Sequence, residues 1–230
     1  MYKIRWMILC LFCSHNMIAQ NREKDFSGQI IISDFYGRPF DKYSPDIEGS
    51  PFLEDRFYKA TLLLHNGRVI DSLGVRIDLY KQEIDIKMPN DIEAVAGPGM
   101  IKEILLQDSA QPQKLLYKFR SGFPAVDNQN ENNYYQVLAD GKITLVKSIR
   151  KKIAEQKNDI SGEIVKVFET YEDYYLVVNK VMIKAKRNTS FFEAQMTDKK
   201  EPVKKYIKDH NINCRYMDKA AELVAFYNSL

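Results

Sequence analysis

Two neighbouring segments of this chain alternate strictly between apolar and charged residues, and this pattern constrains the fold most. Residues 75–79 read Val-Arg-Ile-Asp-Leu, and residues 83–88 read Glu-Ile-Asp-Ile-Lys-Met. Because side chains alternate between the two faces of a strand, each segment has one apolar and one charged face. Such segments are typical of antiparallel strands with one face on the core and one in water. We predict two strands joined by a turn at residues 81–82, with Asp78 and Asp85 on the outward face.

More strands flank this pair. Asn66 and Gly67 separate two apolar runs, and this dipeptide is the strongest short-range signal of a β-hairpin. Residues 134–147 and 174–186 form a repeat in which each copy begins with two tyrosines and reads as strand, tight turn and strand. Two copies are too few for a solenoid, so we expect two similar hairpins in one sheet. Further short strands are expected at residues 29–32, 58–64, 92–95, 101–106, 115–119 and 164–171.

Three stretches lack a clear strand pattern. Glycine and proline punctuate residues 21–56 densely, which predicts an irregular segment that wraps the domain. Residues 121–133 are polar and contain Gly122 and Pro124, and they are expected to form a loop. Residues 148–159 are rich in lysine, and we expect a helical turn or a long loop there.

The hydrophobic period changes near the carboxyl end. Apolar or aromatic residues recur at helical spacing from Val203 to His210, after a proline where the first helical turn tolerates one. Asp218 can cap a second helix. The apolar stripe of that helix contains Ala221, Leu223, Val224, Ala225 and Tyr227.

These elements predict an α+β fold. We expect an antiparallel β-rich sheet or partly closed barrel with two C-terminal helices packed on it. Its parts are the irregular segment at 21–56, an antiparallel β domain at 57–190, and a helical pair at 191–230 that completes the same domain.

The first residues have the features of a secretory signal. Lys3 and Arg5 precede a continuous apolar run at residues 7–12, and Ala19 provides a small residue before Gln20. The run is far shorter than the roughly 20 residues of a membrane-spanning helix. We predict a signal peptide at residues 1–20 with cleavage near Ala19-Gln20, and a soluble mature chain in the periplasm or outside the cell, with no transmembrane segment.

Removal of this segment changes the charge and the cysteine content of the chain. The formal net charge falls from +3 to +1 with the loss of Lys3 and Arg5. A nearly neutral chain lacks the basic excess of an electrostatic nucleic-acid binder, so no nucleic-acid partner is expected. Cys214 becomes the only cysteine. The fold must then be stable without an intramolecular disulfide.

Several of these segments also carry a resemblance to a known family. The residues concerned are 119–124, the Tyr-Tyr hairpins at 134–142 and 174–186, and the lysine-rich and apolar helical patterns from residue 198 to 228. In these segments the chain resembles an uncharacterised family of exported Bacteroidetes-type β-rich proteins. The resemblance covers roughly residues 50–230 and implies an exported, small, β-rich protein without an assigned activity.

Candidate catalytic residues are few. Only His65 and His210 remain after cleavage, too few for the three protein ligands of a typical catalytic zinc site, so neither a metal nor a cofactor is expected. Cys214 with His210 has the residue types of a nucleophile and base. A buried structural cysteine is the preferred interpretation. Asp78 and Asp85 would suit a carboxylate-dependent hydrolase only if they converge in a cleft.

The remaining candidates are surfaces. Adjacent tyrosines on a strand point to opposite faces, so one ring of each pair among Tyr134, Tyr135, Tyr174 and Tyr175 is a candidate for an exposed aromatic binding face. Two lysine clusters, at residues 147–152 and 199–208, are interpreted as solvated faces, with an anionic envelope surface as the alternative partner.

Three hypotheses about function follow. The preferred one is an exported, non-enzymatic binding or scaffolding module of the cell envelope, whose partner is an envelope protein, a glycan or a lipid. The alternatives are a carrier of an apolar ligand and a carboxylate-dependent hydrolase.

Overall fold

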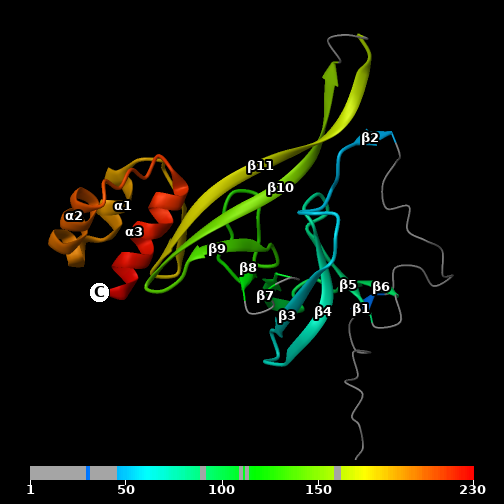
Figure 1. The fold of residues 1–230 in the computed structure, drawn as a ribbon, viewed down its shortest axis with the longest axis horizontal. Coiled ribbons are helices and arrows are strands. Elements are labelled where there is room, and N and C mark those ends of the chain that lie inside the picture. The colour runs from blue at the N-terminus through cyan, green and yellow to red at the C-terminus, as the bar shows by residue number, and fades with distance from the viewer. Residues whose placement is uncertain (1–29, 32–45, 89–91, 109–110, 112–113, 158–161) are drawn as a thin grey trace, which may run out of the picture.

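The computed structural model of the chain describes residues 30–31, 46–88, 92–108, 111, 114–157 and 162–230 (Figure 1). Its strands form one 12-stranded sheet in the order β1-β6-β5-β4-β3-β7-β8-β9-β10-β11-β12, with β2 beside β11. Neighbours along the path pair antiparallel, whereas β2 pairs parallel. The strands are β1 (Ile30–Ile31), β2 (Ile47–Glu48), β3 (Tyr58–Leu64), β4 (Val69–Asp78), β5 (Glu83–Lys87), β6 (Glu93–Ala96), β7 (Ile101–Gln107), β8 (Leu115–Arg120), β9 (Tyr135–Ala139), β10 (Ile143–Lys157), β11 (Ile164–Val178) and β12 (Val181–Lys184). The helices are α1 (Thr189–Gln195), α2 (Lys200–Asp209) and α3 (Met217–Ser229), with a 3-10 turn at Thr197–Lys199.

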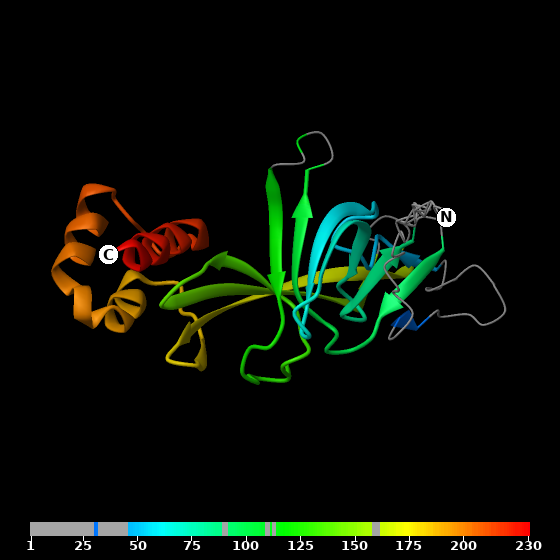
Figure 2. The same ribbon diagram turned by 90° about the horizontal axis from the view of Figure 1, so that it is seen from below.

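A strand-rich sheet with short C-terminal helices is what the sequence predicts. The two ends of the path, β1 and β12, do not pair, so the sheet of the described residues is open and is not closed into a barrel. Figure 2 shows the helices at one end of the molecule and the N-terminal strands at the other. The predicted signal peptide at residues 1–20 lies outside the described residues.

The β3–β4 hairpin forms at the predicted Asn-Gly turn. Gly67 has φ +83°, the left-handed conformation that glycine adopts without a steric penalty. The amide of Leu64 donates to the carbonyl of Arg68 at 2.9 Å, and the amide of Arg68 donates to the side chain of Asn66 at 3.0 Å. The turn therefore fixes the register of β3 against β4.

Strands β3 to β8 enclose the first hydrophobic core. Buried residues alternate along β3, where Tyr58, Ala60, Leu62 and Leu64 all point into this core. Ile149 of β10 belongs to the same core, so the hairpin of β10 and β11 lies directly beside this core. A backbone bond from Lys151 to Leu79 at 2.9 Å links β10 to the turn after β4.

Strands β9 and β12, and the halves of β10 and β11 that pair with them, are covered on both faces. Leu145 and Leu176, which pair across β10 and β11, pack with the helices in the second core. Their neighbours Val146 and Tyr175 point the other way and pack with Phe123 from the loop before β9 in a third core. Because consecutive residues on a strand face opposite sides, one pair of strands supports two separate cores.

The C-terminal region contains one more helix than predicted. The α1 helix begins after Asn188, whose side chain accepts from the amide of Phe191 at 2.8 Å and caps the helix. The side chain of Asn228 fastens α3 to the sheet, since it accepts from the amide of Ile143 at 3.0 Å and donates to the carbonyl of Ile143 at 2.7 Å. The amide of asparagine thus replaces a strand partner at the start of β10.

The N-terminal segment contributes to the sheet as well as covering it. Within the region predicted to be irregular, β1 pairs with β6, and β2 pairs with Lys166 and Val167 of β11. Phe52 forms a bridge with Asp78 at the end of β4. The strand predicted at residues 29–32 is therefore confirmed by β1. Strand β2 lies in the part of 21–56 that was predicted to be irregular, because a two-residue edge strand is too short to show a period.

The largest difference from the sequence prediction is in β10. Residues 148–157, expected as a helical turn or a loop, continue the strand, and β10 and β11 pair over 15 residues each. Strand β9 accompanies β10 only to Lys147, and β12 accompanies β11 only from Tyr175. The distal half of the hairpin projects beyond the rest of the molecule (Figure 1). We call residues 152–157 and 164–171 the arm.

Candidate functional site

The structure places the four predicted tyrosines in three environments. Tyr134 is 8% exposed and lies in the first core, and Tyr135 is 1% exposed and lies in the third core. Tyr175 is fully buried, whereas Tyr174 is partly exposed at the edge of the helical core. Adjacent tyrosines do point to opposite faces. The prediction that one ring of each pair is exposed is wrong for Tyr134 and Tyr135, which are both buried. In the second pair Tyr175 is buried and Tyr174 keeps part of its surface exposed.

Tyr135 and Tyr175 are brought together in the third core. Their ring centroids are 5.9 Å apart at an interplanar angle of 87°. Phe123 packs edge-on against Tyr135 with centroids 5.5 Å apart. Edge-to-face contact of this kind is favourable for aromatic rings. The packing of Phe123 could not be predicted from hydrophobic periodicity, because a single aromatic residue in a polar loop has no periodic neighbours.

A polar network extends from the hydroxyl of Tyr175. This hydroxyl donates to Asp127 at 2.7 Å and accepts from the side-chain amide of Gln129 at 3.3 Å. The hydroxyl of Ser148 in β10 donates to the side-chain oxygen Oε1 of Gln129 at 2.9 Å. Burial is the largest cause that raises the pKa of Tyr175, followed by its bond to Asp127. The phenol therefore stays protonated near neutral pH and acts as a structural donor.

Charged pairs form the outer border of this network. Lys184 lies 2.7 Å from one oxygen of Asp173, and Arg150 pairs with the other oxygen. The bond from Lys184 is the main cause that lowers the pKa of Asp173 below its usual range. Lys184 also lies 3.9 Å from Asp127. The cluster links the loop, β10, β11 and β12, and its charges balance one another.

The hydroxyl of Tyr135 is the exception in this cluster. It is buried without a hydrogen-bond partner among the described residues, and burial raises the pKa of Tyr135 to about 12. A neutral, buried phenol is neither a base nor a nucleophile at neutral pH. The tyrosine cluster therefore holds strands and loop together and contains no group activated for catalysis.

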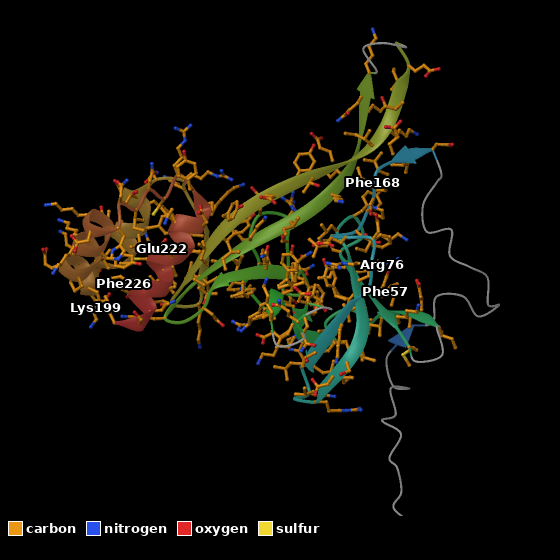
Figure 3. The ribbon with its side chains drawn as sticks, viewed as in Figure 1. Phe57, Arg76, Phe168, Lys199, Glu222 and Phe226 are labelled. Atoms are coloured by element: carbon orange, nitrogen blue, oxygen red, sulfur yellow. The ribbon has the colours of Figure 1, made fainter. Side chains whose placement is uncertain are left out.

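The carboxylates proposed for a hydrolase are buried, which corrects the prediction that they face water. Asp78 is fully buried and Asp85 is 2% exposed. Asp85 lies 3.1 Å from Arg76, whose guanidinium is 3.9 Å from the ring centroid of Phe52 and 4.4 Å from that of Phe57. Figure 3 shows Arg76 and Phe57 side by side. The segment before β3 covers this face of the sheet, and the alternating pattern of β4 and β5 could not reveal that cover.

Asp78 has a separate structural role. Its carboxylate accepts from the backbone amides of Tyr80 at 3.0 Å and Lys81 at 2.8 Å. These bonds close the turn between β4 and β5, as aspartate side chains commonly do. The two carboxylates are thus used for turn closure and for ion pairing, and neither is available as a general acid in the arrangement that a hydrolase needs.

The histidines and the cysteine do not form a catalytic pair. Cys214 is fully buried, and burial raises the pKa of its thiol. His210 stacks on Tyr206 with centroids 4.0 Å apart, and His65 lies 3.2 Å from the hydroxyl of Ser121. Over the residues that the structure describes, no group of three His, Cys, Asp or Glu side chains could hold a metal ion.

The first lysine cluster is mostly used within the fold. Lys151 donates to the carbonyls of Ser50 and Phe52, each at 2.7 Å. Lys147 pairs with Glu172, and Arg150 pairs with Asp173. Lys152, in contrast, lies 5.4 Å from the ring centroid of Tyr171 on the arm.

The arm carries three exposed large apolar side chains. Ile164 is 69% exposed, Tyr171 is 39% exposed and Ile153 is 36% exposed. Phe168 packs edge-on against Tyr80 at the base of the arm, with centroids 5.5 Å apart, and lies where β2 meets β11 (Figure 3). Beyond that contact both faces of the two strands remain open, and apolar and charged side chains lie next to each other.

No family model, curated protein or solved structure matches this chain. The resemblance to exported Bacteroidetes-type proteins therefore stays a prediction. Among the described helices, none combines the length and apolar composition that crossing a bilayer requires.

Proposed function

We propose that this chain is an exported, non-enzymatic binding or scaffolding module of the cell envelope, and that the arm is its contact surface. The observation that carries the proposal is the extension of β10 and β11 beyond every core of the described residues. An isolated two-stranded hairpin is marginally stable in water. Exposed apolar side chains on such an element are a common mark of an interaction site. A partner that covers the arm would stabilise the hairpin and would bury its exposed apolar side chains.

The two alternatives have less support. A hydrolase requires a pair of accessible carboxylates, whereas Asp78 and Asp85 are buried in structural bonds. A carrier requires an apolar cavity between the sheet and the helices. Large side chains occupy that region, and Phe192, Leu223 and Val224 are fully buried there against Leu145 of the sheet.

Site-specific photo-crosslinking in the producing cells tests the proposed contact surface. A photoreactive amino acid at Ile164 or Tyr171 of the arm is expected to give a covalent adduct with a partner. The matched control is Val181, which is 60% exposed but lies in the β11–β12 hairpin outside the arm. Equal yields at the arm and at Val181, or no adduct at all, would reject the arm as the contact surface.

Sequencing the amino terminus of the chain from the envelope fraction tests export. A mature chain that begins at or next to Gln20 supports cleavage of the predicted signal. A full-length chain confined to the cytosol would reject the envelope location, whatever the arm binds.

A further inference from the structure

We infer that the β10 edge of the arm pairs with the same edge of a second copy of this chain, in an antiparallel register centred on Gln156. The inference rests on the proposed role of the arm as a contact surface and names its partner. It follows from the direction of the backbone groups along β10 and from the order of the charges.

The backbone of β10 shows which residues offer hydrogen bonds at this edge. The amide of Lys151 donates to the carbonyl of Leu79, and the side chain of Gln82 donates to the carbonyl of Ile149 at 3.2 Å. Both groups point away from β11, and strand geometry repeats this direction at every second residue. The backbone N–H and C=O groups of residues 153, 155 and 157 therefore point outward. No described strand pairs with residues 152–157 on that side.

The opposite edge shows that the arm accepts an added strand. Strand β2 pairs with Lys166 and Val167 on the outer side of β11. The β10 edge is equally extended and lacks such a cover among the described residues. An unpaired edge of this kind is a template for pairing with another chain.

The charges select one register for a symmetric pair. In an antiparallel pairing centred on Gln156, Glu155 of each copy lies opposite Lys157 of the other, so two opposite-charge pairs form. A register centred on Glu155 places two glutamates face to face. A register centred on Ile153 needs the outward amide of Lys151, which is already bonded to Leu79. A register centred on Ala154 places Ile153 against Glu155.

Pairing of this kind closes by symmetry. The two copies use the same edge, so a dimer forms and no matching edge is left for a third chain. The two arms become a four-stranded sheet, which exceeds the marginal stability of a lone hairpin. The exposed Ile164 lies on β11 and pairs with Lys157 within the hairpin, so it is one strand away from the interface. The paired area is small, so a concentration-dependent dimer is expected.

Disulfide formation tests the register. In a chain with Cys10 and Cys13 replaced by serine, Q156C is expected to form an inter-copy disulfide under mild oxidation, because directly opposed strand residues lie within disulfide distance. The control is A154C, whose two copies are displaced from each other along the strands. Cys214 is buried and remains unchanged in both variants. Equal cross-linking of A154C and Q156C, or none for either, overturns the register.

Sedimentation velocity over a concentration series tests the charge pairs. K157E is expected to raise the dimer dissociation constant by about tenfold or more, because two attractive pairs become repulsive. The swap E155K/K157E restores the opposite-charge pairs and is expected to restore dimerisation. The control is K59E, which makes the same charge change on the exposed side of β3, outside the arm, and should leave dimerisation unchanged. Circular dichroism checks that each variant folds.

The outcomes separate this inference from the proposed function. A chain that stays monomeric at all concentrations, or a swap that dimerises no better than K157E, overturns the inference. If the photo-crosslinked adduct at Ile164 is a different protein, the arm is still a contact surface and the second copy is rejected. An adduct of twice the chain mass supports both.

Discussion

Replacing Asp85 with asparagine removes one half of an ion pair that the fold shields from water. The side chain of Asp85 is 3% exposed and that of Arg76 is 16% exposed, with 3.1 Å between their charged atoms. The guanidinium lies against the rings of Phe52 and Phe57, and its Nε atom has no hydrogen-bond partner among the described residues. D85N therefore leaves a positive charge among aromatic side chains with less compensation.

The expected loss follows from this geometry. Breaking a fully buried pair typically costs about 3–5 kcal/mol of unfolding free energy. Glu93 still lies 3.2 Å from Arg76 and is half-exposed, so it compensates part of the charge. We therefore expect D85N to cost about 2–3 kcal/mol, below the range for an uncompensated buried charge.

Urea unfolding followed by circular dichroism measures this loss. With a urea m-value of about 2–3 kcal/mol/M, the midpoint should fall by about 1 M. The matched control is D71N, the same substitution at an exposed position of β4, which should change stability by less than about 0.5 kcal/mol. In the double variant R76M/D85N the cost should be smaller than the sum of the single variants, because no unpaired charge remains.

Two results would refute this account of Asp85. One is a D85N chain as stable as D71N, since the pair would then contribute nothing. The other is additivity in the double variant, since Arg76 and Asp85 would then act independently. A D85N chain more stable than the wild type would instead favour a functional carboxylate held at a cost to stability.

The remaining predictions concern the two other cores. N228A removes both side-chain bonds to the backbone of Ile143 and should cost about 2–3 kcal/mol in urea unfolding. N228D places a carboxylate oxygen against the carbonyl oxygen of Ile143 and should cost at least as much as N228A, and an unchanged midpoint for N228A would show that α3 docks by apolar contact alone. Y135F removes a buried hydroxyl that has no hydrogen-bond partner in the described part of the chain and should leave stability unchanged or raise it. Y175F breaks the bond to Asp127 and should cost about 1–2 kcal/mol. Equal losses for Y135F and Y175F in the same assay would contradict the assigned hydrogen bonds.

Local patterns predicted the parts of this fold that have one buried face and one exposed face. The alternation at residues 75–79 and 83–88 correctly gives β4 and β5, and the Asn-Gly turn gives the hairpin before them. Helical spacing likewise gives α2 and α3. In each case the period of the apolar residues equals the period of the backbone.

The errors arise where a second segment covers the polar face. Asp85 is charged and lies on the face opposite Ile84, so its environment depends on Phe52 and Phe57, which come from an irregular segment with no period. Tyr135 is buried for the same reason, because Phe123 comes from a polar loop. Burial by a segment distant in the sequence does not change the residue pattern of the strand that it covers, so it cannot be predicted from that pattern.

The strand at residues 164–171 was predicted, but the β10 half of the arm was missed, for the opposite reason. Residues 152–157 have both faces open to water, so no selection for a buried face imposes a period of two on them. Their high charge resembles that of a loop. Only the pairing with β11, a strand that starts just after Gly162, identifies residues 152–157 as a strand.

The continuity of β10 and β11 has a mechanical consequence. Each strand has 15 residues and therefore spans roughly 50 Å without a break, from the arm to the helical end. A tension applied at the tip along the strand direction is transmitted through β10 to Ile143, where the amide of Asn228 passes it to α3. The hairpin can thus act as a stiff lever, and the two hydrogen bonds of Asn228 form a polar joint between it and α3, beside the apolar contacts of the second core.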